Sequence, residues 1–253
     1  MSRFAKPMSL RPNPACAPIR TAMVMAAGLG KRMRPLTITR PKPLVEVAGK
    51  PLIDHVFGRL IAAGVSRVVV NVHYLADALE AHVRRSFPGM EVLFSDERGE
   101  LMDTGGGVTR ALPLIEDDTF LVLASDIFWI DGPVDAISLL ASRWNDAEMD
   151  ALLLLVPLAR AYSHRGTGDF HMDAIGTLSR RREGKLAPFV YASVQIVSRR
   201  LFADAPEGPF STNLLWDRAI AAGRAFGVVH QGLWSEVGVP AAIAETEAML
   251  TGG

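Results

Sequence analysis

Short apolar runs alternate along much of the chain with stretches in which apolar residues recur every three or four positions. Residues 22–27, 67–72 and 119–124 are mostly apolar runs, and such runs are typical of strands buried on both faces. Residues 52–61 place apolar side chains on one helical face, after a proline and before a glycine that favour a helix start and end. This alternation predicts parallel strands linked by helices, and therefore an α/β fold. The same criteria predict further helices over residues 75–85, 106–112, 134–144, 212–222 and 240–250, and strands over 91–94, 150–156 and 225–230.

The pattern changes after Pro157. Residues 165–168 are rich in glycine, and short strands predicted near 169–172, 176–179 and 189–197 suggest antiparallel additions to the sheet. We therefore expect a single domain over residues 20–253, with one part at 20–156 and another at 157–253. Residues 1–19 carry four prolines and Cys16, and we expect a flexible leader there.

Composition narrows the class of protein. The chain has 253 residues, of which 49% are hydrophobic, so it can bury a large core. Lys plus Arg and Asp plus Glu both total 27, so no overall field favours nucleic acid or an anionic membrane as a partner. One cysteine cannot form an intramolecular disulfide, and neither a signal peptide nor a membrane span is apparent. These features favour a cytoplasmic enzyme.

A glycine loop directly follows the first predicted strand. Gly28 and Gly30 allow a sharp turn whose backbone N–H groups can face phosphate oxygens. Lys31, Arg32 and Arg34 add positive charge. Such a loop predicts a nucleoside triphosphate site, and the alternative is a plain glycine turn with solvated basic residues.

Two familiar phosphate loops are excluded by the spacing. A Rossmann fingerprint requires glycine where Met33 stands. A Walker A loop requires glycine at Met25, and Ser or Thr at Arg32. The sequence therefore argues against a dehydrogenase and against a P-loop kinase.

Longer motifs identify a family. Residues 25–37 read MAAGLGKRMRPLT, residues 41–44 read PKPL, and residues 103–107 read DTGGG. Together with a carboxylate after the strand at 119–124, they resemble the sugar-1-phosphate nucleotidylyltransferases over residues 20–251. Within that family the chain is most similar to short bacterial enzymes that uridylylate N-acetylmuramate 1-phosphate in cell-wall sugar recycling. The resemblance implies a nucleotidyltransferase type A fold, which is a Rossmann-like, mostly parallel sheet flanked by helices, here with small antiparallel additions in the C-terminal half.

The resemblance also implies a reaction. A sugar 1-phosphate oxygen attacks the α-phosphorus of a nucleoside triphosphate, and pyrophosphate leaves. Arg34 and Lys31, with the amides of Gly28 and Gly30, would bind the β- and γ-phosphates. Lys42 resembles the family lysine that contacts the α-phosphate or the incoming sugar phosphate, and its alternative is a solvated surface lysine.

Magnesium is the implied cofactor, and two carboxylates are its candidate ligands. Asp126 follows the strand at 119–124, where relatives have Gly-Asp and this chain has Ser125 before the aspartate. The second carboxylate of relatives is an aspartate in Trp-x-Asp-(Val/Ile)-Gly-Thr, whereas this chain has Glu236 and ends the motif with Val239. Because Mg²⁺ requires nearly octahedral geometry, Glu236 is either a ligand of altered geometry or a surface acid. Residues 28–34, Asp126 and Glu236 each follow the end of a predicted strand. Because ligands bind beyond the carboxyl ends of such strands, these three segments should converge.

The remaining candidate contacts concern the base and the sugar. Small residues would let the backbone approach the pyrimidine edge closely, and the alternative for the triple glycine is a flexible loop. Glu97 lies near a polar base or ribose contact of relatives. Asp169 and Asn213 are candidate sugar contacts, or else residues that cap or turn the chain. The small residues expected near the base are Ala26, Ala27, Gly28, Thr104, Gly105 and Gly106.

These observations favour a magnesium-dependent enzyme that forms a UDP-sugar, with UDP-N-acetylmuramate as the expected product. Its partners would be a nucleoside triphosphate and a sugar 1-phosphate. An enzyme that forms GDP-mannose, dTDP-glucose or a CDP-alcohol is the alternative of the same class. A noncatalytic sensor of nucleotide or sugar phosphate is the alternative of another class. The sequence does not decide the oligomeric state.

Overall fold

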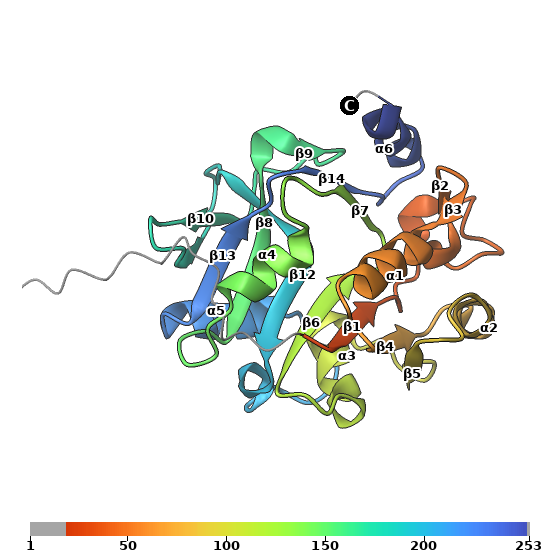
Figure 1. The fold of residues 1–253 in the computed structure, drawn as a ribbon, viewed down its shortest axis with the longest axis horizontal. Coiled ribbons are helices and arrows are strands. Elements are labelled where there is room, and N and C mark those ends of the chain that lie inside the picture. Colours follow the sequence, from red (N-terminus) through yellow and green to blue (C-terminus); the bar gives the residue numbers. More distant parts are fainter. Residues whose placement is uncertain (1–18, 252–253) are drawn as a thin grey trace, which may run out of the picture.

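A nine-stranded mixed sheet forms the centre of the computed structural model, which describes residues 19–251 (Figure 1). Its main path runs β11-β10-β12-β6-β1-β4-β5, and β8 pairs with both β12 and β13. The strands are β1 (Thr21–Met25), β4 (Arg67–Val72), β5 (Glu91–Asp96), β6 (Thr119–Ala124), β8 (Ala151–Pro157), β10 (Phe170–Met172), β11 (Leu178–Arg180), β12 (Phe189–Ser198) and β13 (Ala225–Val229). Cys16 and the rest of the expected leader up to residue 18 lie outside the described residues, whereas Ile19 is buried in the core.

The sheet is parallel where the sequence predicted it to be. β1 pairs in parallel with β4 and β6, β4 with β5, and β13 with β8. This arrangement confirms the α/β fold class. One detail differs from our expectation: β12 is not a small addition, because it lies antiparallel between β6 and β8. β8 is therefore separated from the parallel strands β6, β1, β4 and β5 by an antiparallel strand.

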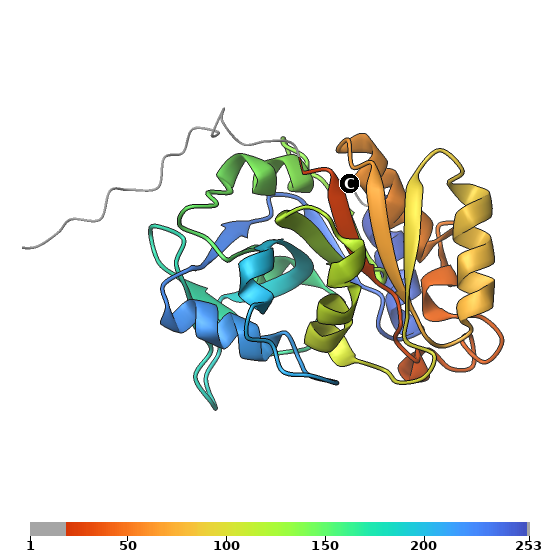
Figure 2. The ribbon, with the colours of Figure 1, turned by 90° about the horizontal axis from the view of Figure 1, so that it is seen from below.

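Helices cover both faces of the sheet. In Figure 2, α1 (Leu52–Ala62) and α4 (Ala136–Arg143) lie on one side, and α3 (Asp103–Ala111) and α5 (Asn213–Ala221) lie on the other. α1 buries the apolar face that the sequence predicts, including Phe57 and Leu60, against one core cluster, whereas α3 and α5 pack into another. α2 (Ala76–Ser86) packs with the first cluster beside β4 and β5. The two core clusters hold the carboxyl ends of the parallel strands in fixed positions.

Two smaller sheets extend this scaffold. β7 (Ile127–Ile130), β14 (Leu233–Glu236) and β9 (Ala161–Tyr162) form one, and β2 (Glu46–Val47) and β3 (Lys50–Pro51) form the other. The C-terminal helix α6 (Ala241–Thr251) contacts both β14 and β2. A third core cluster joins Met33 of the glycine loop to Phe128 and Val237. This cluster connects the loop to the segments that carry the candidate metal carboxylates.

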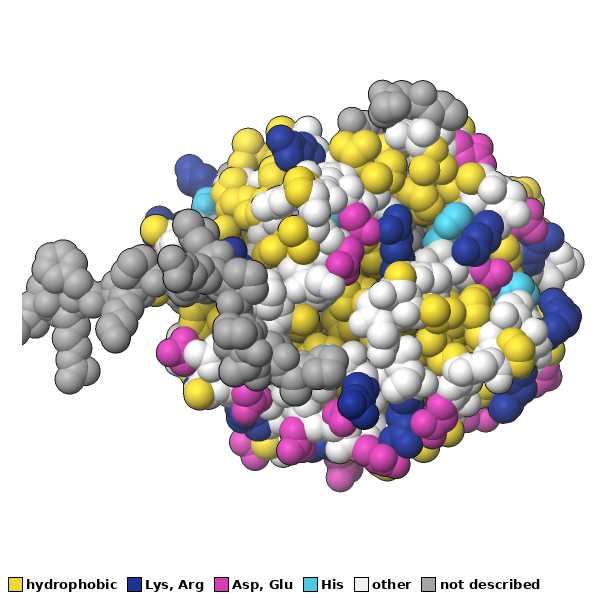
Figure 3. Space-filling model, viewed as in Figure 1, with side chains coloured by type: hydrophobic (Ala, Val, Ile, Leu, Met, Phe, Trp, Pro, Cys, Tyr) yellow, Lys and Arg dark blue, Asp and Glu magenta, His cyan; other side chains and the backbone are white. Residues whose placement is uncertain are grey.

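The surface fits the neutral net charge. On the face in Figure 3, basic and acidic side chains are interspersed along the rim and near the centre, and neither sign covers that face. Among the described residues, none of the helices combines the length and the hydropathy needed to cross a bilayer.

Candidate active site

The glycine loop has one position that requires glycine. Gly30 has a φ of 61°, in the left-handed region that L side chains rarely adopt. A Cβ there would lie 3.1 Å from Thr37 Cγ2 and 3.2 Å from Lys42 Cβ. The Thr37 hydroxyl donates to the Gly30 carbonyl at 2.8 Å, which closes the loop on itself. Gly28 needs no such backbone, since its φ is not positive, and a Cβ there would meet nothing within 4 Å.

Among the described residues, two backbone N–H groups of this loop have no protein partner, although Ala27 itself is only 3% exposed. In the described part of the chain, the N–H groups of Ala27 and Gly28 donate to no protein acceptor. The exposed side chains of Lys31 and Arg34 lie on the same loop. Ala26 differs, because its N–H donates to Asn71 Oδ1 at 2.6 Å. The loop therefore offers the N–H groups of Ala27 and Gly28 and two exposed cations to an anion, whereas the N–H of Ala26 is already bonded to Asn71.

Lys42 and Asp126 form a partly buried ion pair. Lys42 begins a short 3-10 helix (Lys42–Leu44) between two prolines, and Asp126 follows β6. Their side chains are 12% and 22% exposed, so water screens the pair less than it would screen a surface pair. The lysine ammonium is thereby held at the carboxyl end of β6, beside the glycine loop.

Glu236 lies next to Asp126. It is the last residue of β14 and pairs with Ile127 of β7 across the ladder. The Val237 N–H donates to the Asp126 carbonyl at 2.9 Å, and Arg32 lies 3.6 Å from the Glu236 carboxylate. The structure thus brings together the three segments that the sequence predicted to converge.

Asp126, in the turn after β6, and Glu236, at the end of β14, are the candidate ligands for a magnesium ion. Mg²⁺ prefers one or two carboxylates together with phosphate oxygens and water. Asp126 and Glu236 supply hard oxygen ligands, and within residues 19–251 no group of three His, Cys, Asp or Glu side chains is arranged for a metal. Such an ion would have to complete its coordination with substrate oxygens and water, and magnesium binding remains a prediction.

The triple glycine is a packing feature. The N–H groups of Gly105 and Gly106 both donate to the Phe210 carbonyl, at 2.8 and 3.1 Å. A Cβ on Gly105 would overlap the Phe210 ring, and one on Gly106 would lie 2.5 Å from the Gly208 carbonyl oxygen. These two amides are therefore not free for a ligand, and the flexible-loop alternative is wrong because the glycines lie within α3. Base recognition through Thr104, Gly105 and Gly106 remains a prediction. The glycines are required because the loop before α5 packs directly on α3.

We expect Gly106→Ala to destabilise the protein. The methyl group would clash with the backbone of Gly208. Such overpacking typically lowers the free energy of unfolding by about 1–3 kcal/mol. Thermal unfolding should show a clear loss of stability for Gly106→Ala. Gly89→Ala is the matched control, since a Cβ at Gly89 meets nothing within 4 Å. Equal stability of the two variants would contradict this packing role.

Glu97 lies in the protein interior next to the start of α3 and not at an open surface. Its side chain is fully buried, and its carboxylate accepts from Asn71 Nδ2 at 2.7 Å and from the Met102 N–H at 3.0 Å. Asn71 in turn holds the N–H of Ala26. Glu97 therefore links the glycine loop to the start of α3, and a direct contact of Glu97 with base or ribose remains a prediction.

A cavity of about 290 Å³ opens between the ends of β1 and β6 and the start of α5. Thr104 and Asn213, expected at the base and the sugar, both line it. The cavity also exposes side chains that the sequence did not single out. Its lining residues are Met25, Asp103, Thr104, Val122, Leu123, Ala124, Tyr191, Ser193, Gln195, Ser211, Thr212, Asn213 and Trp216.

The wall contributed by β12 is irregular. The register shifts between Tyr191 and Gln195, and Ser193 between them has a φ of 58°. Non-glycine residues in this region are strained and cluster at functional sites. Burial raises the pKa of the Tyr191 phenol, so it stays neutral. Polar residues inside the apolar run 189–197 were the available signal for this wall, but the kink itself has no local signature.

Asp169 supports that wall from outside. Its carboxylate accepts the N–H of Tyr191 at 2.9 Å, and Asp169 is not among the residues that line the cavity. Asp169 therefore contacts the backbone of Tyr191 and does not itself line the cavity. A sugar contact through Asp169 remains a prediction.

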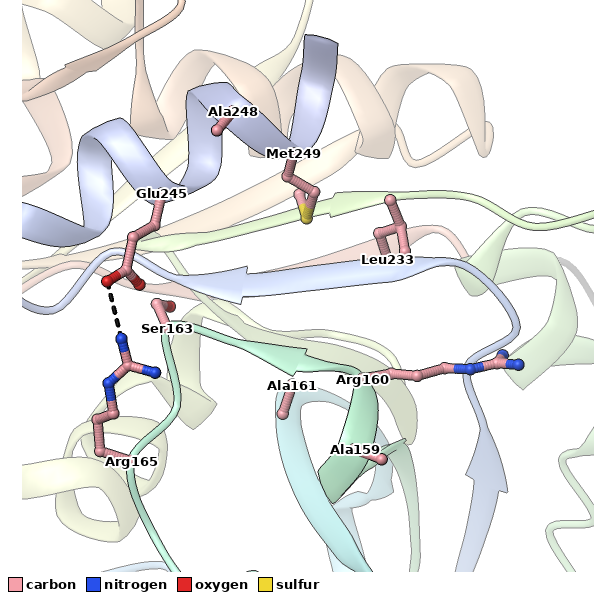
Figure 4. A pocket seen from close by; sticks show the side chains of 9 residues that line it. All are labelled: Ala159, Arg160, Ala161, Ser163, Arg165, Leu233, Glu245, Ala248 and Met249. Carbon is pink, nitrogen blue, oxygen red and sulfur yellow. Dashed lines mark hydrogen bonds and ion pairs between the residues drawn. The ribbon is translucent and has the colours of Figure 1, made fainter. Parts of the chain in front are cut away.

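A second cavity, of about 540 Å³, lies between α6 and the small sheet of β9 and β14. Figure 4 shows Glu245 and Met249 of α6 facing this sheet, with Glu245 paired to Arg165 at 2.9 Å. Ser163 lines the cavity and donates to the Glu236 carbonyl at 2.9 Å. This cavity therefore lies beside the strand that carries Glu236.

In open α/β sheets, ligands bind beyond the carboxyl ends of the strands, which is where this chain places the glycine loop, Lys42 and the two carboxylates. The chain belongs to the nucleotidyl transferase family, whose model matches residues 21–163. This family transfers nucleotidyl groups to sugar 1-phosphates.

Two relatives span nearly the whole chain. The N-acetylmuramate alpha-1-phosphate uridylyltransferase of Caulobacter vibrioides is 46% identical over 90% of this chain and 96% of that protein. The enzyme of the same name from Neisseria meningitidis is 33% identical over 90% of this chain and 97% of that protein. These likenesses confirm the family that the motifs indicated.

Solved structures confirm the fold alone. The inositol-1-phosphate CTP transferase from T. maritima has a TM-score of 0.77 at 18% identity, covering 93% of this chain and 96% of that one. A UDP-glucose pyrophosphorylase complexed with UDP-glucose has a TM-score of 0.74 at 14% identity, covering 92% and 99%.

Proposed function

We propose that this protein transfers the uridylyl group of UTP to N-acetylmuramate 1-phosphate and releases pyrophosphate, in a magnesium-dependent reaction of cytoplasmic cell-wall sugar recycling. The observation that carries the proposal is the Lys42–Asp126 ion pair beside the glycine loop, where the N–H groups of Ala27 and Gly28 have no protein acceptor within residues 19–251. The relative from Caulobacter vibrioides, 46% identical, supports the choice of substrates.

The main obstacle to this reaction is the repulsion between two polyanions. A phosphate oxygen of the sugar 1-phosphate is already anionic, so it needs no general base to attack the α-phosphorus. The bond from the α-phosphorus to the bridging oxygen breaks as the new one forms, and pyrophosphate carries away the electron pair. Catalysis then rests on in-line positioning and on neutralisation of charge.

The residues of the chain divide this work. The free amides of Ala27 and Gly28, with Lys31 and Arg34, would hold the β- and γ-phosphates. Lys42 would neutralise the α-phosphate or the attacking sugar phosphate, because its ammonium is fixed by Asp126. A bound Mg²⁺, held by Asp126 and Glu236, would supply charge neutralisation between the phosphates.

A substrate panel tests the proposal. The purified protein and Mg²⁺ are incubated with each nucleoside triphosphate and each of several sugar 1-phosphates, and pyrophosphate release is measured. We expect the fastest release with UTP and N-acetylmuramate 1-phosphate. Faster release with another pair would assign a different nucleotide sugar. Triphosphate binding without release from any pair would instead indicate a noncatalytic sensor.

A further inference from the structure

The 290 Å³ cavity contains two primary amides whose oxygens are both occupied. Gln195 Oε1 accepts from the indole Nε1 of Trp216 at 2.9 Å. Asn213 Oδ1 accepts from an Arg180 guanidinium nitrogen at 2.9 Å. Indole and guanidinium groups can only donate hydrogen bonds. The orientation of both amides is therefore fixed by chemistry, with oxygen toward the donor and NH₂ on the other side.

The remaining NH₂ groups lack protein acceptors. Gln195 is only 3% exposed and lines the cavity, and within residues 19–251 no acceptor meets its Nε2 or the Nδ2 of Asn213. A buried donor that makes no hydrogen bond lowers the stability of a protein. Gln195 is therefore the buried donor that points to an acceptor on a ligand, whereas Asn213 is exposed and lines the same cavity.

Arg180 is held firmly enough to orient Asn213. Its guanidinium lies 4.8 Å from the ring centroid of Phe170 and 5.4 Å from that of Trp216. Its Nε donates to Asp217 at 2.7 Å, and Arg180 is not among the residues that line the cavity. Arg180 is therefore a positioning residue, and the contact with a ligand falls to the two amides.

We propose that Gln195 and Asn213 form a donor pair that selects sugar 1-phosphates bearing an acyl or carboxylate oxygen. The inference rests on the proposed function and extends it to the basis of sugar selectivity. The location fits, because Met25 and Ala124 also line the cavity, two residues or fewer from the segments that hold the free amides and Asp126. N-acetylmuramate carries both kinds of acceptor, an acetamido carbonyl and a lactyl carboxylate.

Two isosteric substitutions test the pair. Gln195→Glu and Asn213→Asp each keep an oxygen for Trp216 or Arg180 and replace the NH₂ group with a second carboxyl oxygen. We expect KM for N-acetylmuramate 1-phosphate to rise at least about tenfold, since a site built for a hydrogen bond discriminates strongly when its partner is lost. KM for UTP should stay within about twofold. Gln231→Glu is the control, because Gln231 is exposed.

The choice of sugar distinguishes the two acceptors. Glucose 1-phosphate has neither group, so its kcat/KM should fall much less than that of the acyl sugar. N-acetylglucosamine 1-phosphate keeps the acetamido carbonyl alone. A loss equal to that of N-acetylmuramate 1-phosphate would assign the donors to the carbonyl, and a loss as small as that of glucose 1-phosphate would assign them to the carboxylate.

The inference can fail separately from the proposed function. Calorimetric titration with N-acetylmuramate 1-phosphate measures sugar binding whether or not the wild type is active. Absence of activity in the wild type would contradict only the proposed function. Weaker binding to Gln195→Glu and Asn213→Asp than to Gln231→Glu supports the donor pair. Equal binding to all three variants would overturn it, and so would an equal loss of kcat/KM with glucose 1-phosphate.

Discussion

Lys42→Met is expected to lower kcat by about a hundredfold to a thousandfold, the usual effect of removing one preorganised charge-stabilising donor. The lysine is 12% exposed and held by Asp126, so its ammonium reaches the developing charge without reorganisation. Methionine keeps the length and apolar bulk of the side chain. Steady-state kinetics with saturating substrates measure the change, because the loss should fall on kcat more than on KM.

Lys50→Met controls for the loss of one positive charge. Lys50 lies on β3 and is exposed. We expect its kinetics to match those of the wild type. Wild-type turnover in Lys42→Met would remove Lys42 from the chemistry. A similar loss in Lys50→Met would mean that overall charge, not position, governs the rate.

Asp126→Asn should have an effect of similar or larger size, with turnover reduced by about a thousandfold. The amide keeps the shape of the side chain and can still accept a hydrogen bond from Lys42, but it removes the charge that would bind Mg²⁺. The variant should also need a higher Mg²⁺ concentration for half-maximal rate. Initial rates over a Mg²⁺ series, together with thermal unfolding to verify the fold, measure both effects.

Asp204→Asn is the matched control for this substitution. Asp204 is exposed and lies outside the site, so its rate and Mg²⁺ response should be unchanged. The variant Lys42→Met/Asp126→Asn should lose less than the product of the two single losses, because the residues act as a pair. Fully multiplicative losses would show that the two side chains act independently.

The sequence predicted best what depends on local pattern and strand direction. Apolar runs marked β1, β4 and β6, and parallel strands carry their carboxyl ends to one edge of the sheet. The convergence of the glycine loop with Asp126 followed from that rule. The left-handed Gly30 could likewise be expected, because a tight turn after a strand favours glycine.

Features that depend on distant contacts could not be predicted in this way. The Gly105–Gly106 amides are taken by Phe210, about a hundred residues further along the chain. β12, expected as a small antiparallel addition, instead lies between β6 and β8. These contacts are set by tertiary packing, which no local spacing encodes.

The cavity wall illustrates the same limit. Gln195 stands in an apolar strand pattern, where a polar residue usually faces solvent. Gln195 is instead buried, directly after the register shift around Ser193, and accepts a hydrogen bond from the indole N–H of Trp216. Only the assembled fold shows that its NH₂ group opens into a cavity.

A competition reaction tests the central claim most directly. The protein, Mg²⁺ and N-acetylmuramate 1-phosphate are mixed with equimolar UTP, CTP, GTP, ATP and dTTP, and early products are quantified by mass spectrometry, so that product ratios report relative kcat/KM. Our account predicts that UDP-N-acetylmuramate forms as the dominant product. A dominant product with another base, or no nucleotide sugar at all, would contradict it.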